Sequence, residues 1–201
     1  GYGVNSWAEY TEVNLASGAQ VYEVYGGGEQ GHVLCAESVQ KYMETGKRIQ
    51  ALGKTDEEYL RRGIDIYCAR LAHYCKFELV TIPALKGAGS LSPEQLKERE
   101  AGLILKNVAA ADECILLDER GKEYTSKSWA QHLEQKFAHS SRNIVFVTGG
   151  SMGFGKKVYD RADGMVSLSK MTFSHQMVRL VFTEQVYRAC TIIKGEPYHH
   201  E

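Results

Sequence analysis

Asn143-Ile144-Val145-Phe146-Val147-Thr148-Gly149-Gly150 joins an uninterrupted apolar run to a pair of glycines. Such a run is typical of a strand buried on both faces, as in the middle of a parallel sheet. Segment 114–118, read Cys-Ile-Leu-Leu-Asp, has the same character, and so has segment 165–169. Segment 48–52 is expected to form a short strand, and segment 77–82 is expected to form another that ends before Pro83. We therefore expect five strands in one sheet.

Helical patterns alternate with these strands. Thr55 and Glu58 have the spacing of a capping box, and Ser92 precedes a proline at the first position of a second helix. Residues 127–138 and 175–192 are the other expected helices. Strands that alternate with helices predict an α/β fold with a mostly parallel sheet of five to six strands flanked by helices. The helix after Thr55 should bury the face formed by Leu60, Ile64, Tyr67 and Leu71.

A ligand site is expected at one edge of this sheet. In parallel sheets, ligands bind at the carboxyl ends of the strands. Those ends are Asp118, the segment 148–150 and the segment 169–171. The two glycines at 149 and 150 allow the backbone to approach a ligand without interference from a Cβ atom.

Composition places the chain among cytoplasmic globular proteins. Its 201 residues are 43% hydrophobic, which suits one domain with an appendage. No apolar run approaches the roughly 20 residues that a membrane-spanning helix needs, and no signal peptide begins the sequence. The five cysteines contain no CxxC pair, which is typical of reduced thiols in the cytoplasm. We expect neither a membrane association nor a metal site, since no carboxylate or cysteine stands at ligand spacing around His199-His200.

Residues 1–46 differ from the rest. They contain one basic residue against six acidic ones, whereas residues 47–201 contain 23 basic against 19 acidic. Segment 20–25 alternates like a strand, and segment 33–44 has the pattern of a short helix. We expect an N-terminal extension over 1–46, of unknown role, and a separate domain over 47–201 whose basic excess is compatible with a polyanionic partner.

One catalytic motif offers an alternative. Gly149-x-Ser151-x-Gly153 after a strand matches the nucleophile elbow of serine hydrolases. Asp160 or Asp163, followed by His175, would complete a triad in the expected chain order. A hydrolase of that fold needs more strands before the elbow than this chain provides, so Ser151 remains the minor alternative.

Three blocks together resemble a known family. They are Ile115-Leu-Leu-Asp-Glu-Arg-Gly-Lys122, Val145-Phe-Val-Thr-Gly-Gly150 with Gly153-Phe154, and Leu168-Ser-Lys-Met-Thr-Phe-Ser-His175. The last continues to the terminal Gly195-Glu-Pro-Tyr-His-His-Glu201. In order, spacing and C-terminus, residues 47–201 resemble the RlmH-type small rRNA methyltransferases of the SPOUT class. The resemblance implies an α/β knot, in which the end of the chain forms a deep trefoil knot.

The resemblance also implies the cofactor and the substrate. S-adenosylmethionine would bind in a pocket formed by Leu117, Gly149, Gly150, Leu168, Ser169, Lys170, Met171, Thr172 and Phe173. The substrate would be N3 of a pseudouridine in a hairpin loop of 23S rRNA, methylated on the assembled ribosome. A methyltransferase of the same fold with a different RNA target is the nearer alternative.

Catalytic candidates cluster near the end of the chain. N3 carries a proton that must leave, so a nearby base would help the transfer. Tyr198, His199 and Glu201 are the candidates for that role, while Arg188 and His175 are suited to holding RNA phosphate or orienting the tail. Members of the class are homodimers. The apolar final helix, with residues on several faces, fits such an interface.

Overall fold

The computed structural model describes residues 11–13, 22–25, 32–34, 47–139 and 142–198. Its main element is a five-stranded sheet in the order β5-β4-β7-β6-β8, with every neighbouring pair parallel. The expected fold class is therefore confirmed, with five strands. The strands are β4 (Lys47–Leu52), β5 (Phe77–Ile82), β6 (Glu113–Glu123), β7 (Ile144–Thr148) and β8 (Gly164–Ser167).

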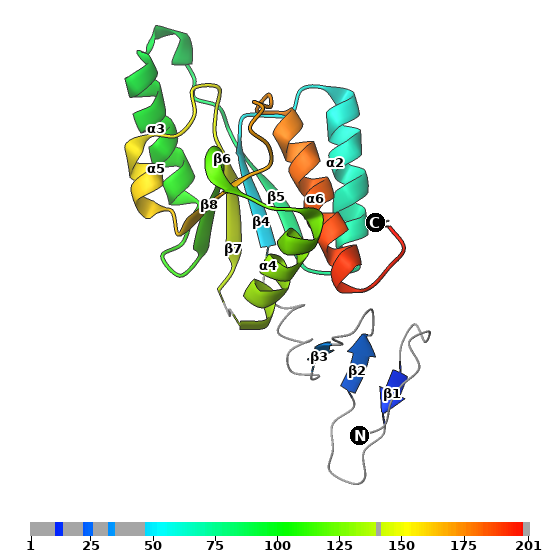
Figure 1. The fold of residues 1–201 in the computed structure, drawn as a ribbon. Helices are drawn as coiled ribbons and strands as arrows, with labels where there is room; N and C mark the ends of the chain where they lie inside the picture. The colour runs from blue at the N-terminus through cyan, green and yellow to red at the C-terminus, as the bar shows by residue number, and fades with distance from the viewer. Residues whose placement is uncertain (1–10, 14–21, 26–31, 35–46, 140–141, 199–201) are drawn as a thin grey trace.

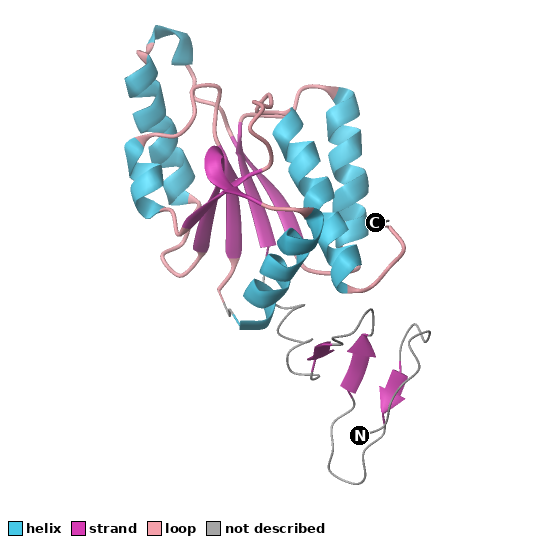
Figure 2. Ribbon diagram, viewed as in Figure 1, coloured by secondary structure: helices cyan, strands magenta, loops and turns pink. Residues whose placement is uncertain are grey.

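Helices cover both faces of this sheet. Figure 2 shows α3 and α5 against one face and α2, α4 and α6 against the other. Their bounds are α2 (Glu58–Leu71), α3 (Pro93–Lys106), α4 (Ser126–His139), α5 (Lys156–Arg161) and α6 (Met177–Ile193), with a 3-10 turn η1 (Ala88–Ser90) before α3. The expected proline-led start of α3 is confirmed, because Ser92 and Gln95 form a reciprocal capping box. Helix α5 was not predicted from the sequence, because it has only six residues.

The two hydrophobic cores are set by the alternation of side chains along β7. Ile144 and Phe146 pack with α4 and α6 on one face, and Val145 and Val147 pack with α3 and α5 on the other. All four are at most 1% exposed. Each such side chain contributes about 1.5–3 kcal/mol by leaving water. This two-sided burial explains why the run at 144–147 is apolar throughout.

The start of α2 departs from the sequence prediction. The capping box from Thr55 to Glu58 is wrong, because the helix begins at Glu58 and Thr55 lies before it. The Thr55 hydroxyl instead accepts a hydrogen bond of 2.9 Å from the buried guanidinium of Arg179. The side chain of Gln176 accepts one of 2.8 Å from the Asp56 N–H. The hydrogen-bonding groups of the residues just before α2 are thus satisfied by side chains more than 100 positions away in the sequence.

The strand expected near the N-terminus is confirmed and the helix after it is not. Strands β1 (Thr11–Val13), β2 (Tyr22–Tyr25) and β3 (His32–Leu34) form a separate antiparallel sheet. The helix prediction over 33–44 is wrong for residues 33 and 34, which pair with β2. The remainder of that prediction, residues 35–44, lies outside the described residues.

An unusual crossing joins β6 and β8. Val166 pairs first with Leu117 and again with Lys122, so residues 118–121 of β6 form an excursion between the two pairings. Gly121 lies directly on the backbone of β8, since a Cβ atom on it would be 2.5 Å from Val166 N and 2.7 Å from Met165 C. Such an intimate crossing of two backbone segments agrees with the expected knotted α/β fold.

Candidate functional site

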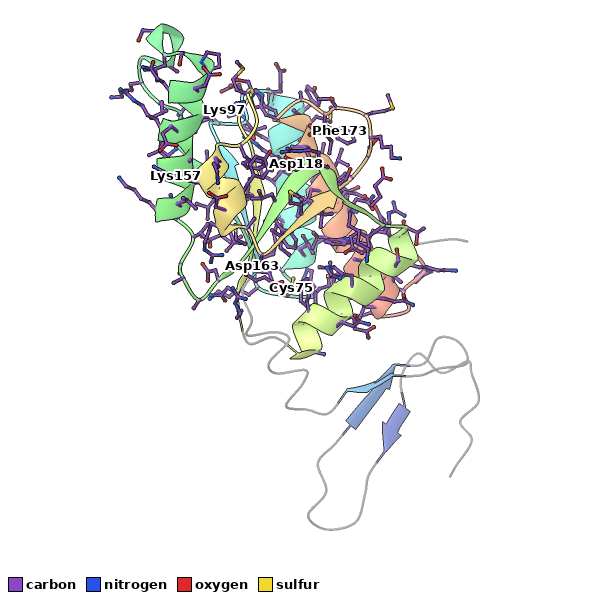
Figure 3. The ribbon with its side chains drawn as sticks, turned by 60° about the vertical axis from the view of Figure 1, so that its left-hand side comes forward. Cys75, Lys97, Asp118, Lys157, Asp163 and Phe173 are labelled. Carbon is purple, nitrogen blue, oxygen red and sulfur yellow. The ribbon has the colours of Figure 1, made fainter. Side chains whose placement is uncertain are left out.

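A cavity of about 490 Å³ opens at the carboxyl ends of β7 and β8, beside residues 117–119 in the middle of β6. Its walls come from these three strands and from the segment that leads into α6. This is the edge of the sheet that the sequence predicted for a ligand site. In Figure 3, Asp118 and Phe173 lie at this upper end, whereas Asp163 and Cys75 lie toward the opposite end. The cavity is lined by residues 117–119, 148–154, 166–169, 171–175 and 178.

The glycine turn after β7 forms one wall. The Gly153 N–H donates to the Gly150 carbonyl at 3.1 Å, and Gly153 has a φ of 78°, a conformation that favours glycine. From the sequence, the glycines at 149 and 150 are explained by a backbone that must approach a ligand closely. At Gly150 the structure adds a second reason, because a Cβ atom there would stand 2.8 Å from the Glu100 carboxylate on α3.

Asp118 was expected to end its strand, but it lies within β6, which continues to Glu123, and both of its carboxylate oxygens are engaged. Its Oδ1 accepts from the N–H and Nε of Arg120, each at 3.0 Å, and its Oδ2 accepts from the Tyr159 hydroxyl at 2.6 Å. The Arg120 guanidinium also lies 4.5 Å from the centre of the Tyr159 ring. Burial alone would raise the pKa of Asp118, but the hydrogen bonds from Arg120 and Tyr159 hold it below its ordinary value. Asp118 is therefore an ionised structural anchor of the cavity wall, poorly suited to accept a proton.

The loop after β8 forms the opposite wall. The Ser167 hydroxyl donates to the Ser169 carbonyl at 3.0 Å, and the Ser169 hydroxyl accepts from the Met171 N–H at 2.9 Å. Met171 is 78% exposed. Strand β8 ends at Ser167, two residues earlier than expected, so residues 168 and 169 belong to this loop.

Eight of the nine predicted cofactor-binding residues line the cavity. Lys170 is the exception: its ammonium lies 3.9 Å from the Glu123 carboxylate, and both side chains are exposed. Position 170 therefore faces away from the wall that its neighbours form. The eight are Leu117, Gly149, Gly150, Leu168, Ser169, Met171, Thr172 and Phe173.

The predicted catalytic residues fall into two groups. His175 lines the cavity. Arg188 and Tyr198 instead form a cluster with Glu184 on α6 and Tyr67 on α2: the Tyr198 hydroxyl donates to Glu184 at 3.1 Å and lies 3.3 Å from that of Tyr67. Arg188 donates to the same Glu184 oxygen at 2.6 Å.

This cluster fixes the tail against the helices. The Arg188 guanidinium lies 4.9 Å from the centre of the Tyr198 ring, and Tyr187 packs edge-on against the same ring. Burial, and then the neighbouring Tyr67 and Glu184, raise the pKa of Tyr198. In Figure 1 the red segment after α6 turns back beside α2 and α6. Neither Arg188 nor Tyr198 lines the cavity of its own chain, while His199 and Glu201 lie outside the described residues.

The structure does not assemble the hydrolase triad. Ser151 and His175 both line the cavity, but the two candidate acids are elsewhere. Asp160 is held by Lys156 at 2.7 Å on α5. Asp163 accepts from the Cys114 N–H at 2.8 Å and from Arg161 at 2.9 Å, toward the amino end of the sheet.

Across 47–139 and 142–198, no three His, Cys, Asp or Glu side chains gather in an arrangement suited to a metal ion. No helix within the described ranges has the length and apolar character needed to cross a membrane.

The family model and the relatives that this chain matches are all methyltransferases. Residues 46–199 match a family model described as "Predicted SPOUT methyltransferase". The protein named "Ribosomal RNA large subunit methyltransferase H" in Christiangramia forsetii is 50% identical over 153 residues, which are 76% of this chain and 98% of that relative. Proteins of the same name in Parabacteroides distasonis and Flavobacterium johnsoniae are 51% identical over 150 residues and 49% identical over 154 residues. These matches cover 75% and 77% of this chain, and 96% and 98% of the respective relatives.

Proposed function

The chain belongs to the SPOUT methyltransferase family, and from that premise we propose that it methylates N3 of a pseudouridine in a hairpin loop of 23S rRNA. S-adenosylmethionine is the methyl donor, and the assembled ribosome is the substrate. The observation that carries the proposal is identity of about half the residues along nearly the whole length of relatives named as large-subunit rRNA methyltransferases. A bacterial ribosome as substrate places the enzyme in the cytoplasm.

The cavity has the character that this cofactor requires. Its volume of about 490 Å³ lies within the range of small-molecule sites. Leu117, Leu168 and Phe173 offer apolar surfaces to a planar base, and the backbone of Gly149 and Gly150 can approach a ligand closely. When bound, the cofactor supplies an activated methyl group on a positively charged sulfur.

The protein's own contribution is positioning and proton removal. In-line approach of N3 to the methyl group is an effect of orientation, which supplies much of the rate in such reactions. Asp118 is engaged by Arg120 and Tyr159, so it does not serve as the base. We assign proton removal to the tail, through Tyr198, His199 or Glu201. Arg188 and His175 contact RNA phosphate or orient the tail.

A homodimer would unite the two groups of catalytic residues. Because Tyr198 and Arg188 are held together at α2 and α6 and do not line the cavity of their own chain, they can act at the cavity of a second copy. Val181 and Gln185 on α6 are partly buried and line a second hollow of about 180 Å³, beside Trp129. Such a surface suits a partner helix. In this arrangement each active site takes its cavity from one protomer and its tail from the other.

Methyl transfer to ribosomes that lack this modification tests the proposal. Wild-type protein should transfer labelled methyl from S-adenosylmethionine, and His199→Ala or deletion of Glu201 should abolish turnover while cofactor binding persists. Normal methylation by both variants would show that the tail assignment is wrong. No transfer by the wild type to any ribosomal RNA would refute the activity itself.

Mixing two inactive variants tests the shared site. Gly150→Arg should block the cavity, while His199→Ala should disable the tail. Equal mixing of freely exchanging protomers should give about a quarter of wild-type activity, since half of the dimers then hold one intact site. If the mixture stays as inactive as its components although protomer exchange is demonstrated, the site lies within one chain.

Residues 1–46 are proposed to be an accessory extension to the catalytic domain at 47–201. The family match begins at residue 46, which agrees with this division. Their acidic composition would repel rRNA if they lay beside the active face. Methylation by a 47–201 fragment at or above the full-chain rate would support the division, and loss of methylation by a folded fragment would contradict it.

A further inference from the structure

Glu100 on α3 carries a buried oxygen without a partner. Among the described residues no group makes a hydrogen bond to its Oε2. Burial raises the pKa of this carboxyl, and no charged neighbour offsets the effect. Glu100 as a whole is only partly buried, but an ionised carboxylate with one oxygen buried and unpaired is costly, so its presence calls for a compensating group.

The carboxylate lies directly behind the cavity wall. A Cβ atom on Gly150 would stand 2.8 Å from Glu100 Oε2 and 3.0 Å from Oε1, and Gly150 itself lines the cavity. Helix α3 also presses on the far end of this turn, where a Cβ atom on Gly155 would be 2.8 Å from the Lys97 carbonyl. The turn is therefore held against α3 at both ends, and one glycine backbone separates Glu100 from the cavity.

Glu100 differs from Asp118, the acidic residue of β6 at the cavity, in how its charge is balanced. Asp118 is neutralised by Arg120, at 3.0 Å. Among the residues that the structure describes, no ion pair neutralises Glu100, so the charge of its ionised form acts across the backbone of Gly150. In a partly buried site this field is weakly screened and favours a positive charge in the cavity.

We propose that Glu100 is a specificity-determining residue that favours the positively charged methyl donor over its neutral-sulfur product. The inference rests on the proposed function. S-adenosylmethionine has a sulfonium, and S-adenosylhomocysteine has the same atoms apart from the methyl group and its positive charge. A carboxylate near the site therefore stabilises the donor more than the product, which helps the product to leave after transfer.

Calorimetric titration of the full chain tests this without any methylation assay. Glu100→Gln keeps the shape of the side chain and removes its charge. Affinity for S-adenosylmethionine should fall roughly tenfold, while affinity for S-adenosylhomocysteine should change less than about twofold. Sinefungin, which carries an amine in place of the sulfonium methyl, should follow S-adenosylmethionine.

Glu98→Gln is the matched control. Glu98 lies on the same helix, but it is exposed and pairs with Lys157 at the surface. This variant should leave both affinities unchanged. Thermal melting of both variants establishes that they fold.

Three outcomes decide the matter. A selective loss of affinity for the two cationic ligands in folded Glu100→Gln supports the proposal. An unchanged ratio of donor to product affinity in that variant overturns it and leaves the proposed function standing. Failure of the wild-type protein to bind S-adenosylmethionine overturns the proposed function, and this inference with it.

Discussion

Gly121→Ala should destabilise the chain strongly, because the added methyl group meets backbone rather than flexible side chains. It would lie 2.5 Å from Val166 N, 2.6 Å from Val166 C and 2.7 Å from Met165 C. Ordinary contacts of carbon with such atoms are roughly 3.5 Å, so the two segments must separate by about 1 Å. Neither can move freely, because Val166 is paired to β6 on both sides of the excursion.

The cost follows from known overpacking effects. Extra methyl groups in tight interiors cost about 1–3 kcal/mol, and the involvement of backbone on both sides places this one near 3 kcal/mol. For a chain of this size that corresponds to a fall of roughly 6–12 °C in the melting midpoint. Urea unfolding and calorimetry at fixed protein concentration measure both quantities.

Gly164→Ala is the control for this experiment. Gly164 lies in β8, the strand against which Gly121 packs, but a Cβ atom on Gly164 meets nothing within 4 Å. Its substitution should change the free energy of unfolding by less than about 1 kcal/mol. If Gly121→Ala unfolds within about 0.5 kcal/mol of the wild type, the crossing is not as tight as described and the reasoning fails.

Three further results are expected. Arg179→Met should lower the free energy of unfolding by about 1–3 kcal/mol, measured in urea, because the Gly53 carbonyl and the Thr55 hydroxyl lose their buried donor. Asp118→Asn should destabilise the protein at neutral pH. The pKa of Asp118 is lowered in the folded state, so this contribution is fully present above the unfolded value of about 3.9 and is lost as pH falls below it. The gap between Asp118→Asn and the wild type should therefore close in urea titrations below about pH 4; a gap that widens there would reverse the assignment. Ser151→Ala should leave methyl transfer within about twofold of wild type, and complete loss would restore a chemical role for that hydroxyl.

The sheet could be predicted because each strand is indicated by the residues of its own short segment. A strand buried on both faces must be apolar throughout, and β7 meets that requirement with Ile144 to Val147. The position of the cavity followed from the expected strand ends, although β6 continues past Asp118 to Glu123. Three sequence blocks together with the C-terminal motif indicated the family, which neither periodicity nor composition indicates.

The features that the sequence did not reveal depend on distant partners. The sequence position of Thr55 is typical of a helix cap, but in the folded chain its hydroxyl accepts a hydrogen bond from the buried Arg179. Glu100 looks like an ordinary acidic residue of an amphipathic helix, and its contact with Gly150 exists only in the folded chain. The separation of Tyr198 from the cavity likewise depends on how the tail folds back over α2 and α6.

The most direct test of the account is the identity of the methylated nucleoside. Ribosomes lacking the modification are incubated with the wild-type protein and S-adenosylmethionine, and the 23S rRNA is then digested and analysed by mass spectrometry. The account predicts that one pseudouridine gains a single methyl group at N3, and that omitting the cofactor prevents this. A methyl group on another nucleoside, or none on the RNA despite cofactor binding, would contradict it.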